Sequence, residues 1–210
     1  MSTQAAYLED VVLVERCLGR VTGAQEAAAR DLFRRYRARV HAALFRILGG
    51  NADMEDLLQE TFIQVFASLK SWRAEASLAT WIDRIAVRVA YRAIGRRRAR
   101  LDQPTFDGTD PDLAVVHDQP GALLAKDGVR RLYAALDRLP PASRIAFALH
   151  EIDGRTMAEV AEVTGASVTA TKLRVWRARR TLEAAAARDP VLREFLRDGH
   201  GSGNDAGGTR

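Results

Sequence analysis

The sequence contains very little cysteine and histidine, which argues against metal and disulfide chemistry. Cys17 is the single cysteine among 210 residues, so it can form neither an internal disulfide nor a cysteine zinc site. The four histidines are scattered along the chain rather than clustered as metal ligands would be. We therefore expect no metal ion and no cofactor, and we expect the reducing environment of the cytoplasm.

Long apolar runs are also lacking. No uninterrupted apolar stretch approaches the roughly 20 residues that span a membrane, and the N-terminal segment carries Glu9 and Asp10, unlike a secretory signal. No Ser/His/Asp order, phosphate-binding glycine loop or metal-ligand set is visible, so we expect a protein that is not an enzyme. The composition is globular, with 47% hydrophobic and 28% charged residues.

Apolar residues recur at helical spacing along almost the whole chain, and no convincing run shows the two-residue period of strands. The sequence therefore predicts an all-α fold. We expect Asp53 to cap the third helix, and we place Phe66 and Val168 on buried helix faces. The predicted helices cover 8–18, 24–48, the stretch after Asp53, a long stretch from Ser77 or Thr80, 129–139, 143–151, 156–163, the stretch after Ser167, and a final turn or two from 189–190.

The helical pattern stops between Leu101 and Gln119. This stretch contains prolines, a glycine and five aspartates, and no Lys or Arg occurs from Leu101 to Ala125. Such a composition is typical of a flexible linker at a domain boundary. We predict two small helical domains, 1–100 and 122–198, joined by an acidic linker at 101–121 and followed by a disordered Gly-rich tail at 199–210.

Basic residues are concentrated in two helices. No acidic residue occurs between Arg84 and Arg100 or between Val163 and Thr181, whereas the net charge of the whole chain is only +5. Two basic faces on one flexible chain suit a long polyanion that is touched at two places, and DNA is the obvious candidate.

The second basic helix belongs to a segment with the pattern of a helix-turn-helix. Thr156 and Glu159 have capping-box spacing, and Gly165 can take the turn conformation that other residues resist. Such a helix fits the major groove of DNA; the alternative is a helical hairpin with a solvated basic face. The side chains expected to face outward are Thr169, Lys172, Leu173, Trp176, Arg177 and Arg180.

The third helix carries an acidic face that should avoid DNA phosphates. Asp56 and Glu60 are one turn apart on it, and Gln59 lies between them. This face suits a basic partner protein, although a face that meets only water is the alternative.

Two tryptophans, Trp72 and Trp81, flank a short polar loop before the first basic helix. Aromatic rings beside basic groups are what single-stranded DNA requires, because unstacked bases need π faces and the backbone needs positive charge. The alternative is that the indoles belong to the core. The basic groups on the following helix recur every four residues, at Arg84, Arg88, Arg92 and Arg96.

Three stretches, in this order, resemble those of the extracytoplasmic-function sigma factors, small two-domain specificity subunits of bacterial RNA polymerase. Residues 53–62 resemble the polymerase-binding helix of the family. Residues 75–86, running into 96–98, resemble its promoter-melting loop and −10 helix. Residues 139–180 resemble its −35 module.

The resemblance implies that core RNA polymerase, through its clamp coiled coil and its flap, and promoter DNA are partners, and it makes an anti-sigma factor a further one. It implies that polymerase contacts come from Asp56, Gln59 and Glu60. Contacts to the −10 element or the melted strand would come from Ser77, Leu78, Thr80, Trp81, Arg84, Arg88 and Arg92. Contacts to the −35 element would come from Thr169, Lys172, Leu173, Arg174 and Trp176, and Arg177 and Arg180 would neutralise phosphates.

Some positions depart from the usual pattern of the family. Leu78 stands where an aromatic residue is common, and Arg88 stands where asparagine is frequent, so the −10 preference is expected to differ. Two other hypotheses remain open at this point, a stand-alone helix-turn-helix repressor and a fragment of a DNA recombinase or transposase. The second would need clustered acids or a nucleophile beside basic residues, and neither is visible.

Overall fold

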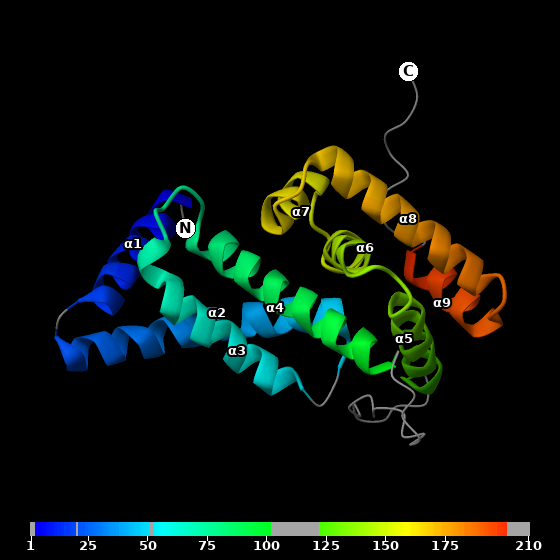
Figure 1. Cartoon of the computed structure of the whole chain (residues 1–210), viewed down its shortest axis with the longest axis horizontal. Coiled ribbons are helices and arrows are strands. Elements are labelled where there is room, and N and C mark those ends of the chain that lie inside the picture. The colour runs from blue at the N-terminus through cyan, green and yellow to red at the C-terminus, as the bar shows by residue number, and fades with distance from the viewer. Residues whose placement is uncertain (1–2, 20, 51–52, 102–121, 201–210) are drawn as a thin grey trace.

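The computed structural model describes residues 3–19, 21–50, 53–101 and 122–200 (Figure 1). The described residues form helices and no strand, which confirms the all-α prediction. Residues 102–121 and 201–210, which hold the expected linker and most of the expected tail, lie outside this description. The α-helices are α1 (Thr3–Leu18), α2 (Thr22–Leu48), α3 (Met54–Ser68), α4 (Leu78–Leu101), α5 (Ala122–Leu136), α6 (Pro141–Phe147), α7 (Met157–Thr164), α8 (Val168–Ala186) and α9 (Pro190–His200).

The N-terminal half is a bundle of α1 to α4 built around α2, which packs against the three other helices. Its centre is made of large aliphatic side chains that water does not reach, because each helix directs one apolar stripe inward. The fully buried members include Leu32, Leu44, Ile47, Leu58, Ile82 and Ile85. The bundle places α3 and α4 side by side (Figure 1).

The C-terminal half packs α8 against α5, α6, α7 and α9. A second apolar cluster lies here, around Leu136, Phe147 and Leu182. The first cluster is shared between the halves, because Ile145, Leu149 and other buried residues of the C-terminal half join the side chains of α2 and α4. The two halves therefore pack against each other through apolar side chains.

Several helix boundaries differ from the predicted ones. Helices resume at Ala122, as expected, but α5 is one helix that ends at Leu136 rather than at Leu139. Helix α6 begins at Pro141, where a proline fits because the first turn needs no N–H partner. A π-helical turn, η2 (Ala148–Ile152), continues α6. Helix α9 is longer than the predicted turn or two, and Asp189 Oδ1 caps it by accepting hydrogen bonds of 3.1 Å from two backbone N–H groups.

Three predictions about single side chains are wrong. Asp53 occupies the position before α3, but its side chain makes no capping hydrogen bond. Phe66 and Val168 were expected on buried faces, yet they are 38% and 42% exposed. In both cases the apolar stripe of the helix is narrower than the predicted one, and it is filled by neighbours such as Phe62 and Val175.

The helix-turn-helix pattern is confirmed as local structure. Thr156 and Glu159 form the reciprocal capping box at the start of α7, and the side chain of Ser167 accepts a hydrogen bond from the N–H of Ala170 at the start of α8. Gly165, between the helices, has φ +66°, a left-handed conformation that costs other residues free energy because of their Cβ atom. The turn therefore fixes the angle at which α8 leaves α7.

We predict that Gly165→Ala lowers the free energy of unfolding by about 1–2 kcal/mol, because an added Cβ would be strained by the positive φ although it would meet nothing within 4 Å. Gly95→Ala is the matched control, since Gly95 lies inside α4 in equally open space without a positive φ. It should raise the free energy of unfolding by about 0.5–1 kcal/mol. Urea unfolding followed by circular dichroism measures both, and changes of the same sign would contradict the argument.

Candidate nucleic-acid interface

The outer face of α8 is a basic surface with exposed apolar groups. Leu173 and Trp176 are 44% and 58% exposed, although both are large and apolar. The side chains of Thr169, Lys172 and Arg177 are also exposed, and that of Arg174 is half-buried. Arg180 lies 3.7 Å from Glu183 on the same helix, an exposed pair that contributes little to stability.

Thr171 explains how α8 keeps this face turned outward. Its side chain is fully buried, and its hydroxyl donates a hydrogen bond of 3.0 Å to the carbonyl oxygen of Ser167. A buried hydroxyl needs such a partner because water cannot reach it. With Thr171, Val175 and Ala178 directed into the core, the predicted −35 residues are left on the opposite side.

The loop before α4 is held by its own hydroxyl groups. Ser77 Oγ caps α4 by accepting a hydrogen bond of 3.1 Å from the N–H of Thr80, and the two hydroxyl oxygens lie 2.9 Å apart. The indole of Trp72 donates to the carbonyl oxygen of Ala76 at 3.1 Å. Trp81 is half-buried against the core. Leu78 is fully buried, so in this conformation its side chain offers no surface to a base.

The arginines that recur every four residues on α4 differ in their surroundings. Arg84 donates to Glu162 of α7, whereas Arg92 and Arg96 lie 3.2 and 3.3 Å from the carboxylate of Glu60 on α3. Arg88 is exposed, and no acidic side chain among the described residues pairs with it. The structure therefore brings Glu60, a predicted polymerase contact, together with Arg92, a predicted DNA contact.

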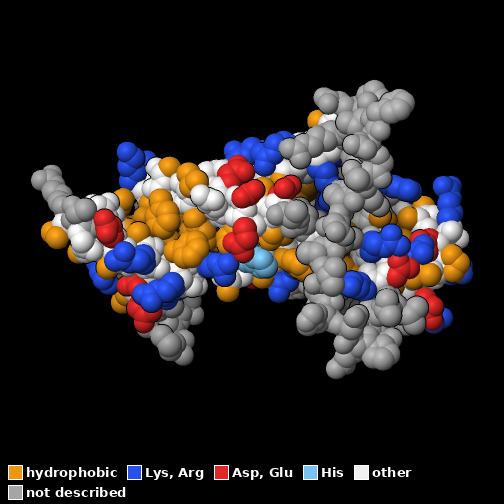
Figure 2. Space-filling view, turned by 90° about the horizontal axis from the view of Figure 1, so that it is seen from below, with side chains coloured by type: hydrophobic (Ala, Val, Ile, Leu, Met, Phe, Trp, Pro, Cys, Tyr) orange, Lys and Arg blue, Asp and Glu red, His pale blue; other side chains and the backbone are white. Residues whose placement is uncertain are grey.

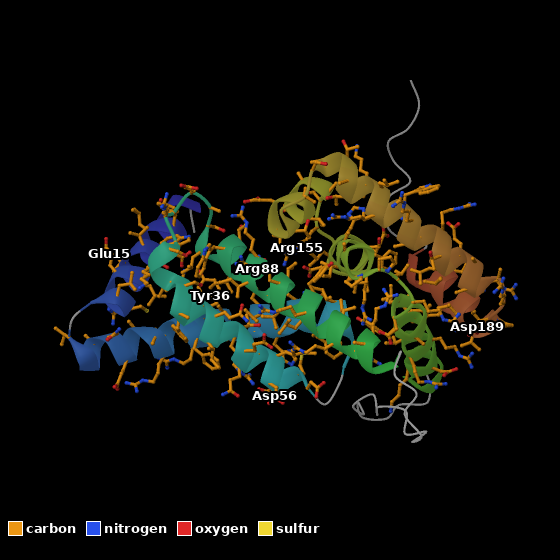
Figure 3. All side chains as sticks on the ribbon, in the orientation of Figure 1. Glu15, Tyr36, Asp56, Arg88, Arg155 and Asp189 are labelled. Atoms are coloured by element: carbon orange, nitrogen blue, oxygen red, sulfur yellow. The ribbon has the colours of Figure 1, made fainter. Side chains whose placement is uncertain are left out.

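The exposed face of α3 is acidic and partly apolar. Asp56 and Gln59 are exposed, and Glu55 pairs with Arg37 at 3.1 Å. Ile63 and Phe66, one and two turns further along, are 60% and 38% exposed. Figure 2 shows this side of the molecule, where acidic side chains gather beside an apolar patch. Asp56 points away from the C-terminal helices, whereas Arg155 lies among them (Figure 3).

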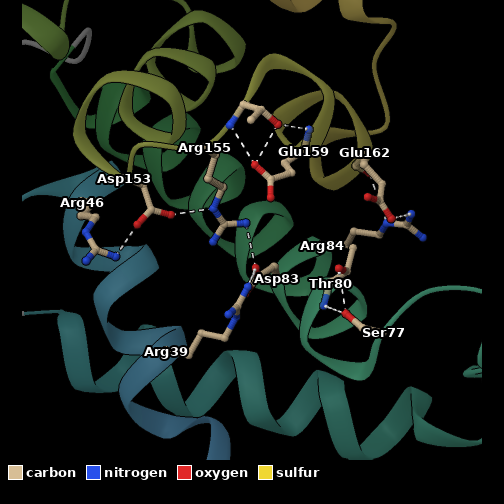
Figure 4. A network of polar contacts seen from close by, with 11 residues as sticks. Arg39, Arg46, Ser77, Thr80, Asp83, Arg84, Asp153, Arg155, Glu159 and Glu162 are labelled. Atoms are coloured by element: carbon tan, nitrogen blue, oxygen red, sulfur yellow. Dashed lines mark hydrogen bonds and ion pairs between the residues drawn. The ribbon is translucent and has the colours of Figure 1, made fainter. Parts of the chain in front are cut away.

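Residues that the sequence did not single out form a charge network between the two halves (Figure 4). Asp83 of α4 is 1% exposed and accepts hydrogen bonds from Arg39 of α2 and from Arg155. Asp153 in turn pairs with Arg155 and with Arg46. One signal was available: Asp83 lies between Ile82 and Ala86, within the apolar stripe of α4, where an acid needs a buried partner.

Two charged groups near this network have shifted pKa values. The backbone N–H and the hydroxyl of Thr156 donate to the Glu159 carboxylate and hold its pKa below the usual range. Burial lowers the pKa of the Arg144 guanidinium, while Asp137 beside it acts in the opposite direction. No group of three or more His, Cys, Asp or Glu side chains that could hold a metal ion occurs in the described part of the chain.

Comparison with known proteins identifies the family of the chain. The family profile for Sigma-70 region 2 matches residues 32–100, and the profile for Sigma-70 region 4 matches residues 129–182. The chain is 31% identical over 186 residues to the ECF RNA polymerase sigma-E factor of Haemophilus influenzae, covering 85% of this chain and 96% of that protein. The chain belongs to the extracytoplasmic-function (ECF) sigma factors.

A further relative of this sigma factor supports the same assignment, and two solved structures have a similar fold. It is 28% identical to the ECF RNA polymerase sigma-E factor of Escherichia coli K12 over 84% of this chain and 93% of that protein. Its fold is similar to that of CnrH, solved with the cytosolic domain of CnrY, at a TM-score of 0.57 and 24% identity over 86% of this chain and 98% of that chain. It is also similar to RpoE from Bartonella quintana, solved with the anti-sigma factor NepR, at a TM-score of 0.56 and 23% identity over 76% and 97%.

The matched regions contain the helices on which the sites were predicted. The region 2 match includes α3 and α4 up to residue 100, and the region 4 match includes α7 and α8. No helix in the described part of the chain is both long enough and apolar enough to cross a membrane.

We predict that Glu60→Gln increases the affinity of the free chain for DNA of mixed sequence by about two- to fivefold at low salt, because it releases Arg92 and Arg96 to bind phosphates. Glu26→Gln is the control, since Glu26 also pairs with an arginine, Arg30, but on α2. Fluorescence anisotropy with a labelled duplex measures both affinities. Equal changes for the two variants would show that only net charge matters.

Proposed function

We propose that this sigma factor directs core RNA polymerase to promoters by three separate surfaces. The face of α8 reads the −35 element, α4 and the loop before it bind the −10 element and the melted strand, and the acidic face of α3 binds the polymerase clamp. In this proposal residues 1–100 and 122–198 are the two working domains, and 101–121 is the linker that passes through the polymerase.

One observation carries the proposal: the charges of the exposed faces are separated by sign. Helices α4 and α8 present basic side chains, whereas the acidic Glu55 and Asp56 lie on a different helix, which also carries the exposed apolar side chains of Ile63 and Phe66. A DNA-binding protein gains nothing from an acidic and apolar face directed at phosphates. Such a face suits a basic protein partner, because its carboxylates steer the encounter and its apolar groups supply buried area.

The opening of DNA in this proposal uses binding energy rather than a catalytic group. Unstacking a base costs a few kcal/mol, and stacking on an aromatic side chain returns about 1–3 kcal/mol per base. Trp81, in the first turn of α4, is only half-buried, so part of its indole is left for such stacking. We accordingly propose a protein without catalytic activity, metal or cofactor.

The proposed partners follow from the family. Core polymerase and promoter DNA are the partners of sigma factors, and two relatives in fold were solved with a regulatory partner, the cytosolic domain of CnrY and the anti-sigma factor NepR. We propose that an anti-sigma factor also controls this chain. Because its targets are the polymerase and the chromosome, we place it in the cytoplasm, where such a partner could also hold it near the inner membrane.

The proposal is tested by transcription with purified core polymerase and a promoter library, followed by sequencing of the transcripts. Promoter-specific start sites are expected. Tight binding of duplex DNA without polymerase, and no such start sites, would favour a repressor instead.

We predict that Lys172→Ala combined with Arg174→Ala abolishes initiation that depends on the −35 element, because both side chains lie on the DNA-facing side of α8. Polymerase binding should stay intact, as native-gel assembly of the holoenzyme would show. Arg130→Ala is the control, since Arg130 pairs with Asp127 on its own helix, α5. Loss of holoenzyme assembly in the double variant would contradict the division of labour between the two domains.

We predict that Asp56→Arg weakens polymerase binding by about tenfold or more, because like charges would then meet at the interface. Glu26→Arg makes the same charge change on α2 and should leave the affinity nearly unchanged. Titration of labelled protein with core polymerase measures both. An equal loss of affinity for core polymerase in the two variants would show that the position of the charge on α3 does not matter for binding.

A further inference from the structure

Tyr91 is an exposed aromatic residue of α4 that was not among the predicted DNA contacts. Its side chain is 50% exposed and belongs to neither apolar cluster. Within the described part of the chain it takes part in no hydrogen bond and no ring contact. A single exposed tyrosine needs no special explanation, so the residues around it decide what its ring can bind.

Gly95, one helical turn after Tyr91, does need an explanation. Glycine destabilises the interior of a helix relative to residues with a side chain, and Gly95 lies inside the 24 residues of α4. Neither packing nor backbone geometry requires a glycine, since an added Cβ would meet nothing within 4 Å and the φ angle is not positive. Side chains on a helix lean toward its N-terminus, so a side chain at position 95 would lean over position 91. Gly95 therefore leaves the ring of Tyr91 uncovered on that side.

Arg88 supplies a free positive charge on the other side of the ring. It lies three residues before Tyr91 and therefore on the same face of α4. Arg84 and Arg92 have acidic partners, whereas Arg88 is exposed and pairs with no acid that the structure describes. Both the ring and the guanidinium are thus open to a ligand in the conformation of the free chain.

An exposed ring between a bare glycine and a free guanidinium suits an unpaired base. Bases of a separated strand stack on aromatic faces whatever their identity, and a neighbouring cation neutralises the backbone. In a duplex the base faces are covered by their neighbours, so only a separated strand can use the ring. A basic protein would be repelled, because no acidic residue occurs between Arg84 and Arg100.

Tyr91 is too far from Trp81 to share a base with it. The two residues are ten positions apart on α4, which corresponds to about 15 Å along the axis of a helix that rises 1.5 Å per residue. A stacked strand rises about 3.4 Å per nucleotide, so the two rings would bind bases about four nucleotides apart. Tyr91 accordingly offers a second, separate place for a base.

We infer that Arg88, Tyr91 and Gly95 form a second stacking platform on α4, which binds an unpaired base of the melted strand. The inference rests on the proposed function only for the identity of that strand as promoter DNA. Tyr91 supplies the ring, Gly95 keeps its face open, and Arg88 neutralises a phosphate beside the bound base.

Fluorescence anisotropy of the free chain at low salt compares two probes with the same number of phosphates, a single-stranded DNA decamer of mixed sequence and a decamer without bases. Tyr91→Ala should weaken binding of the base-bearing probe by about fivefold or more and leave binding of the abasic probe unchanged. Phe45→Ala is the matched control, because it removes a ring that is 42% exposed on α2, and it should change neither affinity. Equal losses with the two probes, or no loss, would overturn the inference.

Gly95→Leu separates the stacking site from any effect on folding. Leucine favours a helix over glycine, so the midpoint of urea unfolding should rise. Binding of the base-bearing probe should nevertheless weaken by about threefold or more, because the new side chain leans over the ring, and binding of the abasic probe should not change. Gly23→Leu on α2, where an added Cβ also meets nothing within 4 Å, should change neither affinity. Full affinity of Gly95→Leu for the base-bearing probe would overturn the role of the glycine.

Two further variants test how the platform holds the strand. Tyr91→Phe should bind the base-bearing probe as tightly as the unchanged chain, because stacking uses the ring and not the hydroxyl. A loss as large as that of Tyr91→Ala would show a contact between the hydroxyl and a phosphate instead, which contradicts stacking. Arg88→Gln should weaken binding of both probes alike, and unchanged affinities would contradict its role beside the ring.

These measurements distinguish the inference from the proposed function. If the chain gives no promoter-specific start sites, the proposed function fails, and the comparison of base-bearing and abasic probes still decides whether the platform binds bases. If start sites appear but Tyr91→Ala binds both probes like the unchanged chain, the inference fails alone.

Discussion

The carboxylate of Asp83 is the point on which the arrangement of the two halves depends. A charge that is 1% exposed must be neutralised within the protein, and Arg39 and Arg155 do so from different domains. The first pair stabilises the N-terminal bundle, and the second attaches the helix-turn-helix to it. Because one group serves both purposes, the position of the DNA-reading module is linked to the electrostatics of the helix that it covers.

Much of the fold could be predicted from the sequence because local signals were strong. The capping box at Thr156, the turn at Gly165 and the apolar period of α2 each act over a few residues. The ion-pair partners of Glu60, Arg92 and Arg84 could not be predicted in this way. Their partners are 32, 32 and 78 residues away, and a charge pattern along one helix does not say which other helix will lie opposite it. The burial of Leu78 could not be predicted from local signals either, because it depends on packing in the bundle.

The basic faces of α4 and α8 differ in how far acidic side chains of the same chain already pair with them. Arg92, Arg96 and Arg84 have acidic partners within the chain, so DNA bound to α4 as proposed would replace an existing ion pair at each of them. The face of α8 offers Lys172, Leu173 and Trp176 directly. The proposed contacts with the −35 element would therefore need less rearrangement of the protein than the proposed contacts with the −10 element.

The different burial of the two ion pairs across the boundary gives them different sensitivity to ions in the surroundings. The pair of Arg84 and Glu162 is about half exposed, so mobile ions screen it over a Debye length of about 8 Å at physiological ionic strength. The pair of Asp83 and Arg155 is shielded from those ions. A rise in salt concentration would thus weaken the contact between α4 and α7 at Arg84 before it weakens the contact at Asp83.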